Sequence, residues 1–185
     1  MDDNLRERAA QTAIDGFIVV ERIYRHSYEV LNALKDDIKK EYKLKESSLR
    51  TNTKSSSDPQ SWIYQFRGLY LAKEKFSLEE YKKKEKPLLF IQTSLYNPNR
   101  QEPILRYGLI KKIFDIKPLK GYTFEDYFGM ILAQIHDNQK SGQIRATHCE
   151  ASAVFDEKPL LDIKEDKDVV LLSKNIGDKY IKFLT

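Results

Sequence analysis

The chain has a single cysteine, Cys149, among its 185 residues. No disulfide can therefore form within it, and a lone thiol is typical of a reducing compartment. The amino terminus lacks the basic, apolar and small-residue pattern of a signal peptide. The longest apolar runs, such as residues 17–20, fall far short of the about 20 residues that a membrane span requires. We therefore expect a cytoplasmic protein that does not insert into a membrane.

Glycine is scarce, and none of its seven occurrences builds a known functional loop. The patterns Gly-x-Gly-x-x-Gly and Gly-x-x-x-x-Gly-Lys, which cradle phosphates, are absent, as is the Gly-x-Ser-x-Gly elbow of serine hydrolases. His148 and Glu150 match the first half of a zinc deaminase signature, but its second half needs two cysteines. We therefore expect no cofactor, and a protein that is not an enzyme.

Aromatic residues are plentiful, with 11 tyrosines and 9 phenylalanines, and 32% of the chain is charged. Such a composition indicates a folded domain with a heavily solvated surface, because disordered chains lack aromatic residues. The length suits one hydrophobic core, so we expect residues 1–185 to form a single α+β domain. Residues 46–59 are rich in serine and threonine and end in Asp-Pro, which predicts a flexible loop.

Residues 3–45 have the periodicity of a long helix. Its apolar stripe follows alternating steps of three and four residues: Phe17, Val20, Tyr24, Ser27, Leu31, Leu34 and Ile38. Gly16 costs about 1 kcal/mol relative to alanine inside a helix, which favours a break there. We interpret the stripe as a helix lying on a sheet, with helix-mediated dimerisation as the alternative.

The rest of the chain alternates between runs of strands and helices. Strand patterns cover residues 62–72, 88–96, 104–113 and 144–155, and helical patterns cover residues 77–84, 123–139 and 168–184. The last helix has a stripe of Val169, Leu172, Ile176, Tyr180 and Phe183. The turn residues 97–101 predict that the second and third strands form an antiparallel hairpin. The predicted fold is α+β, a long N-terminal helix packed on a mostly antiparallel sheet in the order αβββαβ(β)α.

This order resembles the core shared by restriction endonucleases and Holliday-junction resolvases. The resemblance implies an alternative function, a metal-dependent nuclease that is active or degenerate. Such enzymes need an acid on one central strand and Glu-x-Lys on the next, to hold Mg²⁺ and orient a water. Glu-x-Lys occurs here at residues 41–43, 80–82 and 165–167, outside the predicted strands, and residues 104–112 contain no acid. The resemblance is therefore one of element order alone.

Three neighbouring residues of the predicted strand 144–155 could suggest chemistry. Cys149 alternates with Ala151 and Ala153, which indicates a small thiol in the core rather than a nucleophile. His148 and Glu150 share the opposite face, and we expect them to be an exposed pair.

Two further histidines lie on predicted helices. His26 and Glu29 share a helix face with Arg22, whose fixed charge would repel a metal ion, so we expect surface pairing and no metal site. His136 comes near the end of the helix 123–139, where a positive charge would complement the helix dipole.

Positive charge is concentrated between Lys82 and Lys120, where ten lysines and arginines face three acids. Residues 121–157 reverse the balance, with two basic against six acidic residues. Basic side chains with interleaved aromatic rings can bind phosphates and stack bases. The candidate nucleic-acid-binding residues are Lys82, Lys83, Lys84, Lys86, Arg100, Arg106, Tyr107, Lys111 and Lys112. The alternative is a solvated lysine-rich surface that balances the acidic stretches.

These features together predict a non-catalytic intracellular interaction protein, an accessory or regulatory subunit. Its expected partner is another protein or a second copy of itself, and nucleic-acid phosphates on the basic hairpin are a second expected ligand. No catalytic residue and no metal ligand is predicted.

Overall fold

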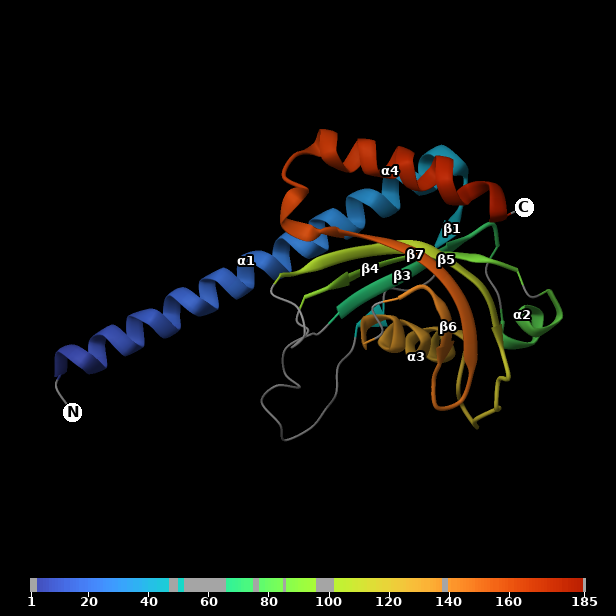
Figure 1. Ribbon diagram of the computed structural model, residues 1–185, viewed down its shortest axis with the longest axis horizontal. Coiled ribbons are helices and arrows are strands. Elements are labelled where there is room, and N and C mark those ends of the chain that lie inside the picture. The colour runs from blue at the N-terminus through green and yellow to red at the C-terminus, as the bar shows by residue number, and fades with distance from the viewer. Residues whose placement is uncertain are drawn as a thin grey trace.

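The chain folds as an α+β protein with one long helix, one curved sheet and shorter helices on both faces of the sheet (Figure 1). The computed structural model describes residues 3–46, 50–51, 66–74, 77–84, 86–95, 102–137 and 140–184. The helices are α1 (Asp3–Tyr42), α2 (Leu78–Lys84), α3 (Phe124–Asp137), α4 (Asp166–Tyr180) and the 3-10 turns η2 (Leu160–Asp162) and η3 (Ile181–Leu184). No helix in these ranges is long and apolar enough to span a membrane.

The sheet has seven strands, and every described pair is antiparallel. The strands are β1 (Lys45–Glu46), β2 (Arg50–Thr51), β3 (Phe66–Ala72), β4 (Leu88–Ser94), β5 (Ile104–Phe114), β6 (Gly142–Arg145) and β7 (Glu150–Pro159). Their order is β1-β3-β4-β5-β7-β6, and β2 also pairs with β3. The predicted hairpin is confirmed, because β4 and β5 are antiparallel neighbours from Leu88↔Ile110 to Ser94↔Ile104.

Helices cover both faces of this sheet, α1 and α4 on one face and α3 on the other (Figure 1). Strand β4 is buried along its whole length, and its residues alternate between the two sides. Leu89 and Ile91 pack in the core beneath α1 and α4, whereas Leu88 and Phe90 pack in the core against α3. A strand covered on both faces is apolar on both, which explains the continuous run Leu88–Ile91.

Strands β5 and β7 curve around α3 (Figure 1). Two local features permit this curvature. A β-bulge between Ile110 and Lys112 shifts the register, so that Ile110 and Ile113 both face α3. At Gly108 the two strands approach so closely that an added Cβ would lie 2.1 Å from the Val154 carbonyl oxygen.

The shorter helices begin where local capping residues predict. Ser77 and Glu80 form the expected capping box of α2, because each backbone N–H donates to the other side chain, at 2.8 and 3.2 Å. The Thr123 backbone N–H and hydroxyl both donate to Asp126 at the start of α3. The expected apolar stripe of α3 is buried as well. These elements are confirmed.

Four sequence expectations differ from the structure. Helix α1 continues through Gly16 without a break. The expected strand 144–155 divides into β6 and β7 around a turn at residues 146–149. Arg50–Thr51, inside the expected loop 46–59, pairs with β3 as a short strand. Phe183 is 51% exposed, because the chain leaves the α4 periodicity in a 3-10 turn after Tyr180. Residues 47–49 and 52–59 of the expected loop, residues 62–65 of the expected strand and the turn 97–101 lie outside the described residues.

Candidate interaction surface

Helix α1 has two parts with opposite surroundings. Its C-terminal part, residues 24–42, packs beside α4 on one face of the sheet, whereas residues 3–23 project beyond the ends of the strands (Figure 1). We call residues 3–23 the arm and residues 24–42 the base. The expectation that this helix packs on the sheet is therefore confirmed for the base.

The base is attached to the body by polar and apolar contacts. The Ser27 hydroxyl donates to the Thr93 hydroxyl of β4 at 2.9 Å, and both side chains are buried. The Arg67 guanidinium of β3 lies over the rings of Tyr24 and Tyr28, at 5.9 and 5.6 Å from their centroids. Farther along, the remaining stripe residues are at most 1% exposed: Leu31, Leu34 and Ile38. Burial of the stripe residues therefore begins at Tyr24 and is complete from Ser27.

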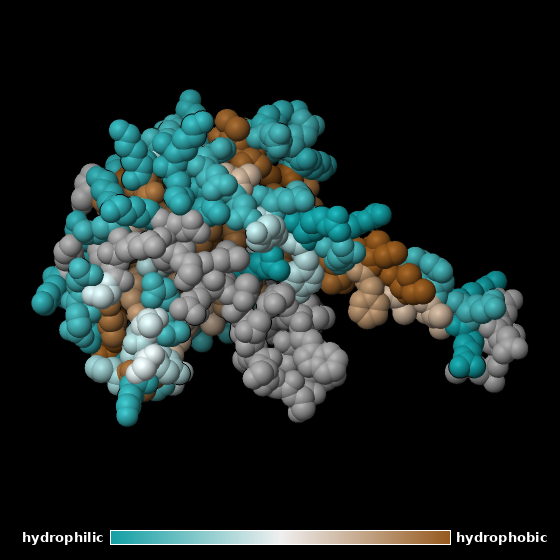
Figure 2. Space-filling model, turned by 180° about the vertical axis from the view of Figure 1, so that it is seen from behind, coloured by the Kyte–Doolittle hydropathy of each residue, from teal (hydrophilic) through white to brown (hydrophobic). Residues whose placement is uncertain are grey.

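The arm carries large apolar side chains in solvent. Phe17 is 77% exposed, Val19 54%, Ile14 52%, and Ile18 and Val20 40% each. Figure 2 shows these hydrophobic residues gathered on the middle of the projecting helix. Phe17 and Val20 were expected in the stripe that packs on the sheet, and that expectation is wrong because the sheet ends before it reaches them. Apolar side chains of this size are usually buried in a folded domain, so their exposure makes the arm the candidate interaction surface.

Apolar side chains lie on more than one side of the arm. Ala13, Phe17 and Val20 continue the stripe of the base, since steps of three and four residues keep side chains on one helix face. Ile18 and Val19 lie one and two residues from Phe17, and so point to other sides. The sequence analysis did not identify Ile14, Ile18 and Val19. The signal for an exposed apolar surface was the run of four apolar residues, 17–20, because four consecutive residues of one helix cannot all face a single core.

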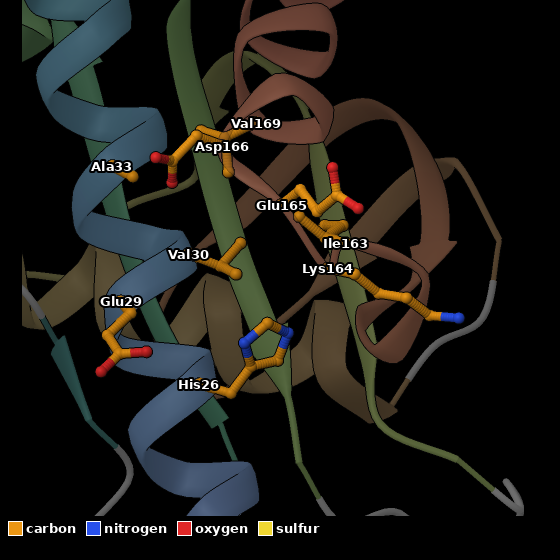
Figure 3. A pocket seen from close by; sticks show the side chains of 9 residues that line it. All are labelled: His26, Glu29, Val30, Ala33, Ile163, Lys164, Glu165, Asp166 and Val169. Atoms are coloured by element: carbon orange, nitrogen blue, oxygen red, sulfur yellow. The ribbon is translucent and has the colours of Figure 1, made fainter.

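A pocket of about 140 Å³ lies where α1 meets the start of α4 (Figure 3). His26, Glu29, Val30 and Ala33 of α1 line it, with residues 163–166 and Val169 on the other side. The His26 Nε2 lies 3.3 Å from the Leu160 carbonyl oxygen. Figure 3 shows the carboxylate of Glu29 turned away from the α4 side. The acids therefore do not converge on a common point, and His26 contacts a backbone carbonyl oxygen.

A buried polar group joins the C-terminal end of α3 to β4 and β5. Arg106 is 0% exposed; its guanidinium donates to the Ile135 and His136 carbonyl oxygens and pairs with Glu157 at 3.3 Å. Its fixed charge thus lies at the negative end of the α3 dipole. Burial lowers the pKa of His136, an effect that Arg106 strengthens and Asp137 opposes. The fixed positive charge at this helix end is therefore Arg106, and His136 lies in the last turn of α3 as expected but is buried.

Ser94 and His136 form a side-chain pair, Ser94 Oγ with His136 Nδ1. Such a pair can serve as nucleophile and base where substrate reaches it. Here both residues are 3% exposed, and the Phe66 ring lies 5.4 Å from the imidazole. The pair is therefore part of the core against α3.

The residues singled out around Cys149 have structural roles. Cys149 is 2% exposed, and burial raises the pKa of its thiol to about 11, which confirms its expected place in the core. His148 lies in the turn before β7, where its carbonyl oxygen accepts the Lys117 N–H at 2.9 Å. Glu150 begins β7 and lies 3.7 Å from Arg145. The two therefore do not share a strand face as expected, since the turn separates them.

The described lysines among the predicted residues lie at the α2 end of the sheet, where Leu88 pairs with Ile110, whereas Arg106 is buried. Lys82 pairs with Glu79 at 3.5 Å, and Lys86 with Glu74 at 3.2 Å, at the α2 end of the sheet. Lys83 is exposed on α2, where Lys84 is the last residue. Lys111 is exposed at the bulge of β5, and Lys112 next to it is half-buried. Arg100 lies outside the described residues.

Arg106 is buried and Tyr107 is half-buried, on opposite faces of β5. Arg106 faces α3, and Tyr107 faces α4, where its ring is 6.5 Å from that of Tyr180. Burial raises the pKa of the Tyr107 hydroxyl, helped by Asp156. Arg106 therefore does not reach the surface, whereas Tyr107 presents part of its side chain there. An arginine in phase with Ile104 and Ile110 was the sequence signal that this position faces a core.

The features of a nuclease centre are absent from the described parts of the chain. No group of three or more His, Cys, Asp and Glu side chains there could hold a metal ion. The three Glu-x-Lys sequences lie at the end of α1, in α2 and at the start of α4, and none is on a strand.

Comparisons of the chain with protein-family models, with curated proteins and with solved structures find no match.

Proposed function

We propose that this chain is a non-catalytic interaction protein that binds a protein partner through the arm of α1. The observation that supports the proposal is the exposed apolar surface of residues 14–20 on a helix that projects from the body. A helix of about 20 residues is marginally stable in water without packing, so a partner helix or groove would supply both its burial and its order.

The polar groups of the body favour this function over catalysis. Ser94, His136 and Cys149 are buried, and the buried Arg106 is engaged with helix carbonyls and Glu157. Nucleic-acid binding, the second expected role, would depend on exposed lysines such as Lys83 and Lys111, because Arg106 is buried and Tyr107 is half-buried. Lys82 and Lys86 pair with Glu79 and Glu74, as is typical of a solvated surface, and the arm is the stronger candidate.

The test is site-specific photo-crosslinking in the cells that make the protein. A photoreactive amino acid replaces Phe17 on the arm, and in a matched control it replaces Lys174, which is exposed on α4. We expect a discrete protein adduct from position 17 and none from position 174. The same adducts from both positions, or none from position 17, would refute the proposal.

A further inference from the structure

The apolar stripe continues along the arm, and we call this part of it the seam. Its side chains are small at one end and large at the other. Ala10 and Ala13 stand at its N-terminal end, and Phe17 and Val20 at its C-terminal end, all exposed. Two arms in parallel register would place each residue against itself. Phe17 would then face Phe17, where two large rings are crowded, and Ala13 would face Ala13, where the space between the helices is not filled. Helix pairs pack well where large side chains fill the space above small ones.

An antiparallel pair across a two-fold axis near residue 15 removes this mismatch. Phe17 of one copy then lies over Ala13 of the other, and Val20 lies over Ala10. Each contact occurs twice, because a two-fold interface is self-complementary. The arm therefore carries both halves of a large-on-small interface.

Charge favours the same orientation. Arg6 lies on the seam side, four residues before Ala10, so a parallel pair would bring two guanidinium groups together. The antiparallel pair places Arg6 opposite Tyr24 of the second copy and about one turn from its Glu21. Tyr24 already attracts a guanidinium in this way, since Arg67 lies 5.9 Å from its ring.

The available surface suits a modest interface. Antiparallel overlap of residues 6–24 is about 30 Å long and a helix is about 10 Å wide, which buries several hundred Å² on each copy. This lies at the low end of specific protein interfaces, where affinities on the order of micromolar are common. The overlap ends at Tyr24, where the seam enters the body and its burial by α4 and the sheet begins.

We propose that the arm pairs antiparallel with the arm of a second copy, so that the protein is a homodimer. This inference rests on the proposed function, because it names the partner of the arm. The dimer continues outside the body the same seam that Leu31, Leu34 and Ile38 bury inside it.

The first test measures the mass of the full chain by sedimentation over a range of concentrations. Phe17→Glu places a charge in the seam and is expected to leave only monomer. Val19→Glu is the matched control, because Val19 is 54% exposed on another side of the helix and is expected to keep the dimer. Equal loss of dimer from both variants would overturn the two-helix arrangement.

The second test determines the orientation by disulfide crosslinking. Ala10→Cys and Val20→Cys chains are mixed and oxidised; Cys149 is buried and does not interfere. An antiparallel pair gives the mixed disulfide between positions 10 and 20. A parallel pair would hold these positions about 15 Å apart, too far for a disulfide, and would link each variant to itself. Disulfides within each variant alone would therefore refute the antiparallel pairing.

The outcomes separate this inference from the proposed function. A wild-type chain that stays monomeric at about 100 μM, far above a micromolar Kd, would refute self-pairing. The photo-crosslinking experiment would still report a different protein bound at position 17. Adducts of that protein, with no dimer, would support the proposed function and overturn the second copy as the occupant.

Discussion

The arm and the base of α1 share one apolar sequence pattern, but their apolar side chains differ in burial. In the base, Leu34 and Ile38 are 0% exposed, whereas Phe17 and Val20 on the same stripe of the arm are 77% and 40% exposed. The difference is the extent of the sheet and α4, which cover the stripe only from Tyr24 onward. The apolar stripe alone therefore does not show where burial ends, because burial depends on how far the sheet and α4 extend along the helix.

The largest expected difference between the two parts is the cost of removing a large side chain. Leu34→Ala should lower the free energy of unfolding by about 2–5 kcal/mol, because it leaves a cavity in a packed core. Phe17→Ala should change it by less than about 0.5 kcal/mol, because the side chain is in water when the chain is monomeric. Urea unfolding at low protein concentration measures both. Similar losses from the two variants would mean that the arm packs on the body in solution.

A smaller difference concerns hydroxyl groups. Ser27→Ala removes the partner of the buried Thr93 hydroxyl and should cost about 1–3 kcal/mol. Thr12→Ala is the matched change on the arm, where the hydroxyl donates to the exposed Arg8 carbonyl oxygen. It should change stability by less than about 0.5 kcal/mol. The comparison breaks down if the unfolding curves of the two variants coincide.

The elements that the sequence predicted well are those with local signals. The capping residues Ser77 and Glu80 and the stripe of α3 depend on neighbours within one or two turns, which are visible in the sequence. The hairpin of β4 and β5 was predicted for the same reason, because turn residues separate two strand-like runs.

The candidate site was harder to predict because it depends on distant parts of the chain. The stripe of α1 indicated burial, and helix-mediated dimerisation was the alternative, but only the tertiary structure separates covered from uncovered residues. Arg106 was wrongly predicted at the surface for a related reason. A basic residue in a strand is expected to be exposed unless the helix whose carbonyl oxygens it binds is known. The α3 carbonyls that bind it lie 29 and 30 residues away.

Acidification should act on the body and leave the arm unaffected. The pKa of His136 is below its ordinary value of 6.5 in the folded protein, mainly because of burial, so the unfolded chain binds the proton more readily. Stability is then complete above about pH 6.5 and falls as the pH drops below it toward the lowered folded pKa. His136→Gln should flatten this fall in unfolding experiments between pH 7 and pH 5. Residues 3–23 contain no histidine, so protection of the arm amides should not follow the same curve.

The smallest expected effect is a gain in helix stability confined to the arm. Gly16→Ala should stabilise the arm helix by about 1 kcal/mol, because an added Cβ meets nothing within 4 Å and alanine favours the helix. Hydrogen exchange of the monomeric chain should show slower exchange at residues 10–20 and unchanged exchange in the base.

Gly177→Ala is the contrasting change in α4, because its Cβ would lie 1.9 Å from the Tyr42 hydroxyl oxygen. Displacing that ring should cost about 1–3 kcal/mol and offset the gain in helix propensity. The same substitution then stabilises the helix that projects and strains the helix that packs, and equal gains at both positions would show that the base and α4 are not in close contact.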